Sequence, residues 1–268
     1  NAFDLSSIKD TSHNQLYMGK TILNEWLDKD NQRRQAIGYY GNVNEELRKE
    51  KGIVSPLFDN DIPKEIMRKE KKTGLDIYIL ADTLPPQWRN TAIRESIKNY
   101  YAAIDHKLLK IGITDQDGNI DYIDHTTIDN YIADKNLSVK YQLAALRDPI
   151  NGKPFEKEIE HLGKVKLFIN MQEGANKQVH LMRRPRMKVK EYSKPTLSNY
   201  AGVMLVDDKE GNENMRLLEN ANHDKLENFR QKERFGDDAS IIEDLDRFLD
   251  ETLQELREIE GKKQFTLR

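Results

Sequence analysis

The side chains best suited to chemistry form a dense basic cluster: Arg183, Arg184, Arg186, Lys188 and Lys190. Guanidinium and ammonium groups bind phosphate and carboxylate oxygens, and arginine does so through paired hydrogen bonds. Three interpretations compete. The first, which carries the most weight, is a solvated hairpin tip; the second is an anion sensor that points cations at a phosphate; the third is a patch that binds nucleic acid. Nucleic acid is disfavoured, because few aromatic residues lie among the basic ones and the net charge is −3.

Other polar motifs fall short of a catalytic or metal site. Gly19-Lys20-Thr21 ends like a phosphate-binding loop, but Asn14 stands where that loop needs its first glycine. Residues 115–121 alternate like the start of a calcium loop, yet Ile120 occupies the glycine position. The six histidines lack the spacing of metal ligands. The sequence therefore predicts no catalytic residue and no metal site in this chain.

The composition excludes several classes of protein. The 268 residues are 37% hydrophobic and 33% charged, with no cysteine. No apolar run approaches the roughly 20 residues of a membrane span. The lack of cysteine removes disulfides and thiol nucleophiles and fits a reducing cytoplasm. We expect a cytoplasmic protein without membrane contact, and a piece of a longer protein, because the chain begins with Asn1 rather than methionine.

Local patterns predict the elements that must position the basic cluster. In chain order they are a strand over 75–80, a helix over 87–109, a hairpin of 110–114 against 120–123, helices over 126–134 and 138–147, and strands over 164–170, 178–182, 187–192 and 200–206. The basic cluster thus lies at a turn between two strands. The stretch 200–206 is almost wholly apolar, which predicts a central strand covered on both faces.

Two helices are expected after the strands. Asp224 and Glu227 have the spacing of a helix start, and Ser240 with Glu243 forms a capping box before the last helix. The last helix carries an apolar stripe, which predicts that it packs against the rest of the chain, and Gly261 is expected to end it. Docking of a partner helix or a second copy on this stripe stays open. The element order predicts an α+β fold: a mixed sheet with helices packed on one face, plus C-terminal helices.

Several of these segments resemble the region that follows the nucleotide-binding core in prokaryotic proteins with a GHKL-type ATPase domain, the class of Hsp90, gyrase B, MutL and histidine kinases. Gly74-Leu75-Asp76-Ile77 is similar to the strand that ends such a domain, with Leu75 in place of a threonine. The later similar segments, within about residues 60–230, are the Trp88 helix, the Met182–Met187 hairpin, the Ala201-Gly202-Val203 strand and the His223-Asp224 helix start.

The resemblance implies a transducer domain, related to domain 2 of ribosomal protein S5. In this class a basic residue of a transducer loop contacts the γ-phosphate, which implies a phosphate-sensing role for the cluster: Arg183, Arg184, Arg186 or Lys188. The implied organisation is a tail of an ATPase-type domain or an irregular segment over 1–82, a transducer-like domain over 83–236 and a C-terminal helix over 237–268. The function implied is a non-catalytic relay of nucleotide state.

The motifs that bind ATP in this class are not found in the sequence. No Asp-x-Gly-x-Gly occurs, since residues 115–119 lack the second glycine. We expect the chain alone neither to bind ATP tightly nor to hydrolyse it. ATP and Mg²⁺ would belong to the parent protein, and the partner would be an upstream ATPase domain or a separate protein. The alternatives are a stand-alone interaction module, which could form a homodimer, and a hydrolase with an unrecognised set of acidic residues.

Overall fold

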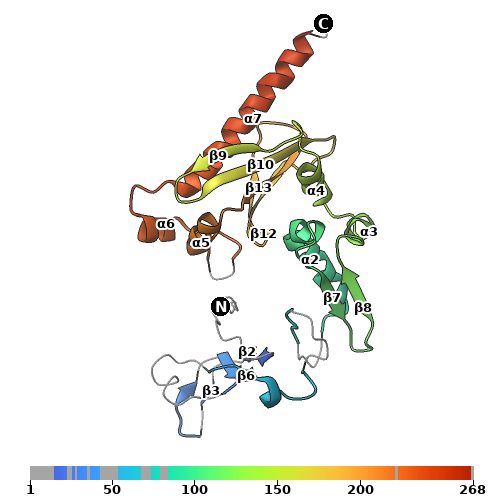
Figure 1. Ribbon diagram of the computed structural model, residues 1–268, viewed down its shortest axis with the longest axis vertical. Coiled ribbons are helices and arrows are strands. Elements are labelled where there is room, and N and C mark those ends of the chain that lie inside the picture. Colours follow the sequence, from blue (N-terminus) through green and yellow to red (C-terminus); the bar gives the residue numbers. More distant parts are fainter. Residues whose placement is uncertain are drawn as a thin grey trace. The chain divides into compact units, whose positions relative to one another are not determined.

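The computed structural model describes residues 15–22, 26–27, 29–34, 37–42, 54–67, 74–78, 84–220 and 223–266. The chain divides into two compact units, Asn1–Asp82 and Thr83–Arg268, and each is described by itself. Figure 1 labels elements of both units where there is room.

The described residues of the first unit form three short antiparallel pairs and one 3-10 turn. β1 (Leu16–Tyr17) pairs with β6 (Leu57–Phe58), β2 (Gly19–Ile22) with β5 (Ile37–Tyr40), and β3 (Trp26–Leu27) with β4 (Arg33–Arg34), while η2 covers Asp59–Asp61. Gly19-Lys20-Thr21 therefore lies within a strand. A phosphate-binding loop would need these residues at the start of a helix.

The predicted strand over 75–80 is not formed in its described part. Residues 74–78 have no regular secondary structure. Leu75 and Ile77 are 70% and 77% exposed. Residues 79–80 lie outside the described residues. The prediction is wrong over 75–78 because strand propensity reflects packing against neighbouring strands, and no strand in the described ranges pairs with this segment.

The second unit opens with the amphipathic helix that the sequence predicts, α2 (Trp88–Asp105). Its buried residues recur three and four positions apart and include Ile93, Ile97, Tyr101 and Ile104. The predicted hairpin and the next two helices are also confirmed as β7 (Ile111–Thr114), β8 (Ile120–Ile123), α3 (Ile128–Asp134) and α4 (Lys140–Arg147).

The hairpin turn between β7 and β8 is closed by its own aspartate. Asp115 Oδ1 accepts hydrogen bonds from the backbone N–H groups of Asp117 and Asn119 at 3.0 and 2.8 Å. Arg89 of α2 binds both Asp115 and Asp121. The carboxylates that resemble a calcium loop thus join the hairpin to α2.

A five-stranded mixed sheet forms the centre of this unit (Figure 1). Its spatial order is β12 (Met187–Ser193), β11 (Gln178–Arg183), β13 (Tyr200–Val206), β10 (Gly163–Met171) and β9 (Phe155–Ile159). β11 and β13 are parallel, and the other neighbours are antiparallel. The predicted α+β class is confirmed, and β13 is the central, fully buried strand as expected. The sequence analysis missed β9, since three of its five residues are charged.

Helices cover both faces of the sheet, which differs from the expected packing on one face. Because side chains alternate along a strand, Met204 and Val206 of β13 join α5 and α7 in one apolar cluster. Val203 and Leu205 join α2, α3 and α4 in the other. The single-face expectation fails because β13 is almost wholly apolar and is buried at every position, so both of its faces need cover.

α5 (Lys209–Leu218) follows β13 closely. Asp208 caps it, since its carboxylate accepts a hydrogen bond from the backbone N–H of Gly211 at 2.9 Å. A Cβ atom at Gly211 would stand 2.0 Å from the backbone oxygen of Leu162. Only glycine lets α5 approach the β9–β10 turn this closely.

The next helix starts later than predicted. α6 (Asn228–Phe235) begins after Glu227, and Asp224 lies in a turn before it. The prediction at Asp224 is wrong because Asn220 provides the local partner. Asn220 Oδ1 accepts from the Asp224 backbone N–H at 3.1 Å, and Asn220 Nδ2 donates to Asp224 Oδ1 at 2.7 Å.

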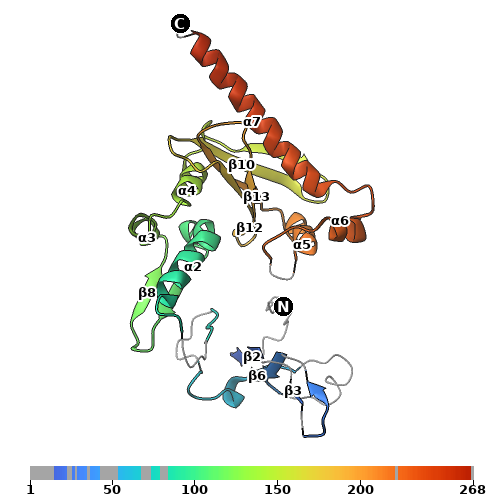
Figure 2. The same ribbon diagram turned by 180° about the vertical axis from the view of Figure 1, so that it is seen from behind.

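The last helix, α7 (Ile241–Thr266), crosses one face of the sheet and continues past it (Figures 1 and 2). Four members of the predicted packing stripe are buried, which confirms them: Ile242, Leu245, Leu249 and Leu256. The fifth, Ile259, is 39% exposed. Gly261 does not end the helix; an internal glycine costs only about 1 kcal/mol. No helix in the described ranges combines the length and apolar composition required to cross a bilayer.

Candidate functional site

The basic cluster surrounds a three-residue turn between β11 and β12, residues 184–186, here called the basic turn. The backbone N–H of Arg186 donates to the Arg183 oxygen at 2.5 Å. Arg186 has φ of 74°, a left-handed conformation that is uncommon for a residue other than glycine. The backbone of the basic turn is therefore tightly closed.

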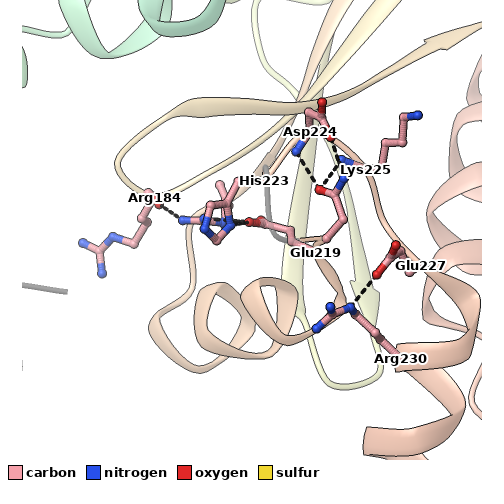
Figure 3. A network of polar contacts seen from close by, with 9 residues as sticks. Arg184, Glu219, His223, Asp224, Lys225, Glu227 and Arg230 are labelled. Carbon is pink, nitrogen blue, oxygen red and sulfur yellow. Dashed lines mark hydrogen bonds and ion pairs between the residues drawn. The ribbon is translucent and has the colours of Figure 1, made fainter. Parts of the chain in front are cut away.

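Arg183 is buried and held by the carboxylate of Glu219, which Figure 3 labels. Its Nε and Nη2 donate to the two oxygens of Glu219, the latter at 2.8 Å. The two side chains are 7% and 0% exposed. His223 Nδ1 lies 2.6 Å from Glu219 Oε2 and contributes a second contact to the same carboxylate. Because two basic side chains surround one buried carboxylate, Glu219 holds the end of β11 and the segment after α5 together.

The segment after α5 is closed by its own hydrogen bonds. The Asn220 backbone N–H donates to the Lys225 oxygen at 3.0 Å, and the Glu227 N–H donates to the Leu218 oxygen at 2.9 Å. Glu227 in turn binds Arg230 on the first turn of α6 at 2.5 Å. Figure 3 shows the Glu227–Arg230 bond and, separately, the contacts of Asp224 and Lys225. The connection between α5 and α6 is therefore a stapled loop attached to Arg183.

Arg184 and Arg186 share a weaker partner. Arg184 Nε is 3.9 Å and Arg186 Nη2 3.6 Å from the carboxylate of Asp207, which directly follows β13. Arg184 keeps 55% of its side chain exposed, against 18% for Arg186. Because it is the more exposed of the two, Arg184 is the member of the turn best placed to meet an anion in solvent. Arg186 also affects His106, which follows α2: burial lowers the pKa of His106, and the charge of Arg186 lowers it further.

Lys188 belongs to a separate polar group on β12. Its Nζ lies 2.5 Å from Glu191 Oε1. Glu191 also lies 3.8 Å from Nε2 of the buried His180, whose Nδ1 is 3.1 Å from the Tyr101 hydroxyl. Burial lowers the pKa of His180 to about 3, with a further contribution from Lys188. Lys188 is therefore engaged beside a neutral histidine.

Of the four predicted sensing residues, the structure places two, Arg184 and Arg186, beside one another at Asp207. Arg183 and Lys188 each bind a different carboxylate. Sequence reasoning missed the partners Glu219 and Asp207. Two signals point to them: Glu219 precedes His223 by four residues, and Asp207 follows an apolar strand.

The arrangement can contact an anion, but it offers no sign of metal chemistry. Within the described ranges, no group of three or more histidine or carboxylate residues could hold a metal ion. No family model matches the chain, and comparisons with curated proteins and with solved structures find no match. Function must therefore be argued from the geometry and the sequence.

Proposed function

We propose that residues 83–268 form the transducer-like part of a GHKL-type ATPase, and that the basic turn senses the terminal phosphate of a nucleotide bound elsewhere. One observation carries the proposal: the three arginines of this region differ in exposure, with Arg184 the most exposed. Arg183 is 6% exposed and bound to Glu219, whereas the Arg184 side chain is 55% exposed. A rigid base with an exposed guanidinium suits recognition of a phosphate oxygen.

The weak contact with Asp207 supports the same role. Separations of 3.6 and 3.9 Å exceed those of a hydrogen-bonded pair, so Asp207 holds the two guanidinium groups loosely. A phosphate offers more charge and more acceptor oxygens than one carboxylate. It would therefore displace Asp207 as the partner of Arg184 at small cost.

The proposal assigns ATP and Mg²⁺ to another domain of the parent protein, in a cytoplasmic setting, and assigns no chemical step to this chain. The residues described here then report that a phosphate is present. Incubated with ATP and Mg²⁺, the chain alone is expected to leave the nucleotide intact. Release of inorganic phosphate that survives purification to homogeneity would oppose this reading.

The sensor role is tested by ATP turnover in the protein that joins this chain to its ATPase domain. Arg184→Ala should lower turnover about tenfold, the effect of losing one charge-assisted hydrogen bond. Arg234→Ala is the matched control, because Arg234 is also an exposed arginine, on α6. Equal turnover of the two variants and the wild type would remove the proposal.

A second candidate function, a stand-alone interaction module, is favoured by one observation on α7. Among the α7 side chains described, which run to Ile259, Leu256 is the last buried one, and Ile259 is 39% exposed. A second copy or a partner helix could cover that turn. Light scattering on a variant truncated after Glu258 tests this: a smaller particle with unchanged circular dichroism supports the module, and an unchanged mass opposes it.

A further inference from the structure

The basic turn is connected to the start of α7 by a chain of polar contacts. The first link is Glu219, whose buried carboxylate binds Arg183. Arg183 Nη1 also donates to the backbone oxygen of Arg184 at 2.8 Å. The position of the turn backbone therefore depends on the same guanidinium that Glu219 holds.

The second link is the loop between α5 and α6. Glu219 pairs with Leu226 through an antiparallel bridge, and Glu227 bonds back to Leu218. Because these contacts close the loop, a shift of Glu219 moves the residues that begin α6. Arg230, bound to Glu227, extends the same series onto α6.

The third link is Gln231, a buried residue of α6 that is 2% exposed. Its Nε2 donates to the Ala239 oxygen at 2.8 Å and to Glu243 at 3.0 Å, and its Oε1 accepts from the Ile242 N–H at 2.8 Å. The first four N–H groups of a helix have no partner within the helix. Gln231 supplies one of those partners, so the start of α7 is fixed by α6.

We propose that Glu219 and Gln231 are positioning residues that couple the basic turn to the N-terminus of α7. This deepens the proposed function, on which it rests for the meaning of the signal, by identifying α7 as the output element. Coupling between two sites is reciprocal. A change made at α7 must therefore appear at the basic turn.

The test is hydrogen–deuterium exchange on the whole chain without nucleotide. Gln231→Met removes the bonds to α7 and should speed exchange in residues 183–187 and 219–227 at least tenfold more than in β13. The matched control is Gln142→Met. Gln142 is a buried glutamine of α4 whose Nε2 donates to Asn176 and Gln178 at 2.7 and 3.0 Å, so its hydrogen bonds lie outside the basic turn and α7. It should affect the turn no more than it affects β13.

A global loss of stability would raise exchange in β13 and in the turn together, so the ratio isolates coupling. If both variants give the same ratio, the proposal is overturned. Should Gln231→Met fail to fold, Glu243→Ala removes one of the same contacts from the exposed side and is judged by the same ratio. The assay uses no ATP, so it can fail while the turnover effect of Arg184→Ala holds, and the reverse.

Discussion

Two charge pairs flank the same hairpin, and their surroundings differ. Arg183 and Glu219 are 7% and 0% exposed and meet through two parallel hydrogen bonds. Lys188 and Glu191 are 17% and 44% exposed and meet through one. A buried carboxylate that loses its partner keeps an unsolvated charge, whereas an exposed one regains water. Burial, rather than the number of charges, therefore decides which pair fixes the basic turn.

The largest expected effect is at the buried pair. Glu219→Ala leaves the guanidinium of Arg183 buried without its carboxylate. The free energy of unfolding should fall by about 3–5 kcal/mol. Urea denaturation followed by circular dichroism measures the change. A loss below about 1 kcal/mol would mean that the two pairs do not differ as argued.

The second effect is on pH dependence and concerns His180, beside the exposed pair. Its pKa is lowered from 6.5 to about 3 by burial, so the folded state keeps it neutral while the unfolded state binds a proton below pH 6.5. Stability is therefore present above pH 6.5 and is lost as the pH falls toward 3, by about 1.4 kcal/mol per pH unit.

From pH 7 to pH 5 this loss amounts to about 2 kcal/mol. His180→Asn does not titrate and should flatten the decline. Urea midpoints of both proteins at several pH values measure the difference. Parallel curves for the two proteins would show that His180 is accessible to protons in the folded state.

A double replacement sharpens the comparison further. Arg183→Met with Glu219→Leu removes both buried charges and keeps apolar volume in their place. Stability should return to within about 1 kcal/mol of the wild type, because well-packed apolar groups often substitute for a buried ion pair. The same urea assay applies. A double variant as unstable as Glu219→Ala would indicate that the hydrogen bonds, rather than the unpaired charge, carry the energy.

The smallest effect is expected at the exposed pair. Glu191→Ala should change the free energy of unfolding by about 0.5 kcal/mol at physiological salt. The variant serves as the matched partner of Glu219→Ala, since both remove one carboxylate from the hairpin's surroundings. A loss of stability as large as that of Glu219→Ala would show that burial does not distinguish the two charge pairs.

Periodicity predicts most of the second unit because its elements are long or strongly patterned. The apolar run of β13 and the stripe of α2 are both confirmed. The failures have local causes. Leu75 to Tyr78 have strand-like residues without a neighbouring strand in the described ranges, and Asp224 is bonded by Asn220 before it can start a helix.

For the candidate site, the sequence identifies the cations but not their partners. Arg183 and Arg184 are adjacent in the chain, yet Arg183, the last residue of β11, is buried, whereas Arg184, the first residue of the turn, is 55% exposed. Glu219 comes 36 residues after Arg183. Only the packing of α5 against the sheet brings Arg183 and Glu219 together, so no local pattern could distinguish the anchored Arg183 from the exposed Arg184.

The length of α7 has a mechanical consequence. Its 26 residues span about 39 Å. Leu256 is the last buried side chain among those described, and the helix continues for about 15 Å beyond it. A tilt of about 5° at the first turn would sweep the far tip through roughly 3 Å, by the geometry of a rigid rod of that length. The end of α7 beyond Leu256 therefore acts as a lever arm, which magnifies a small rotation into a displacement large enough to break a contact.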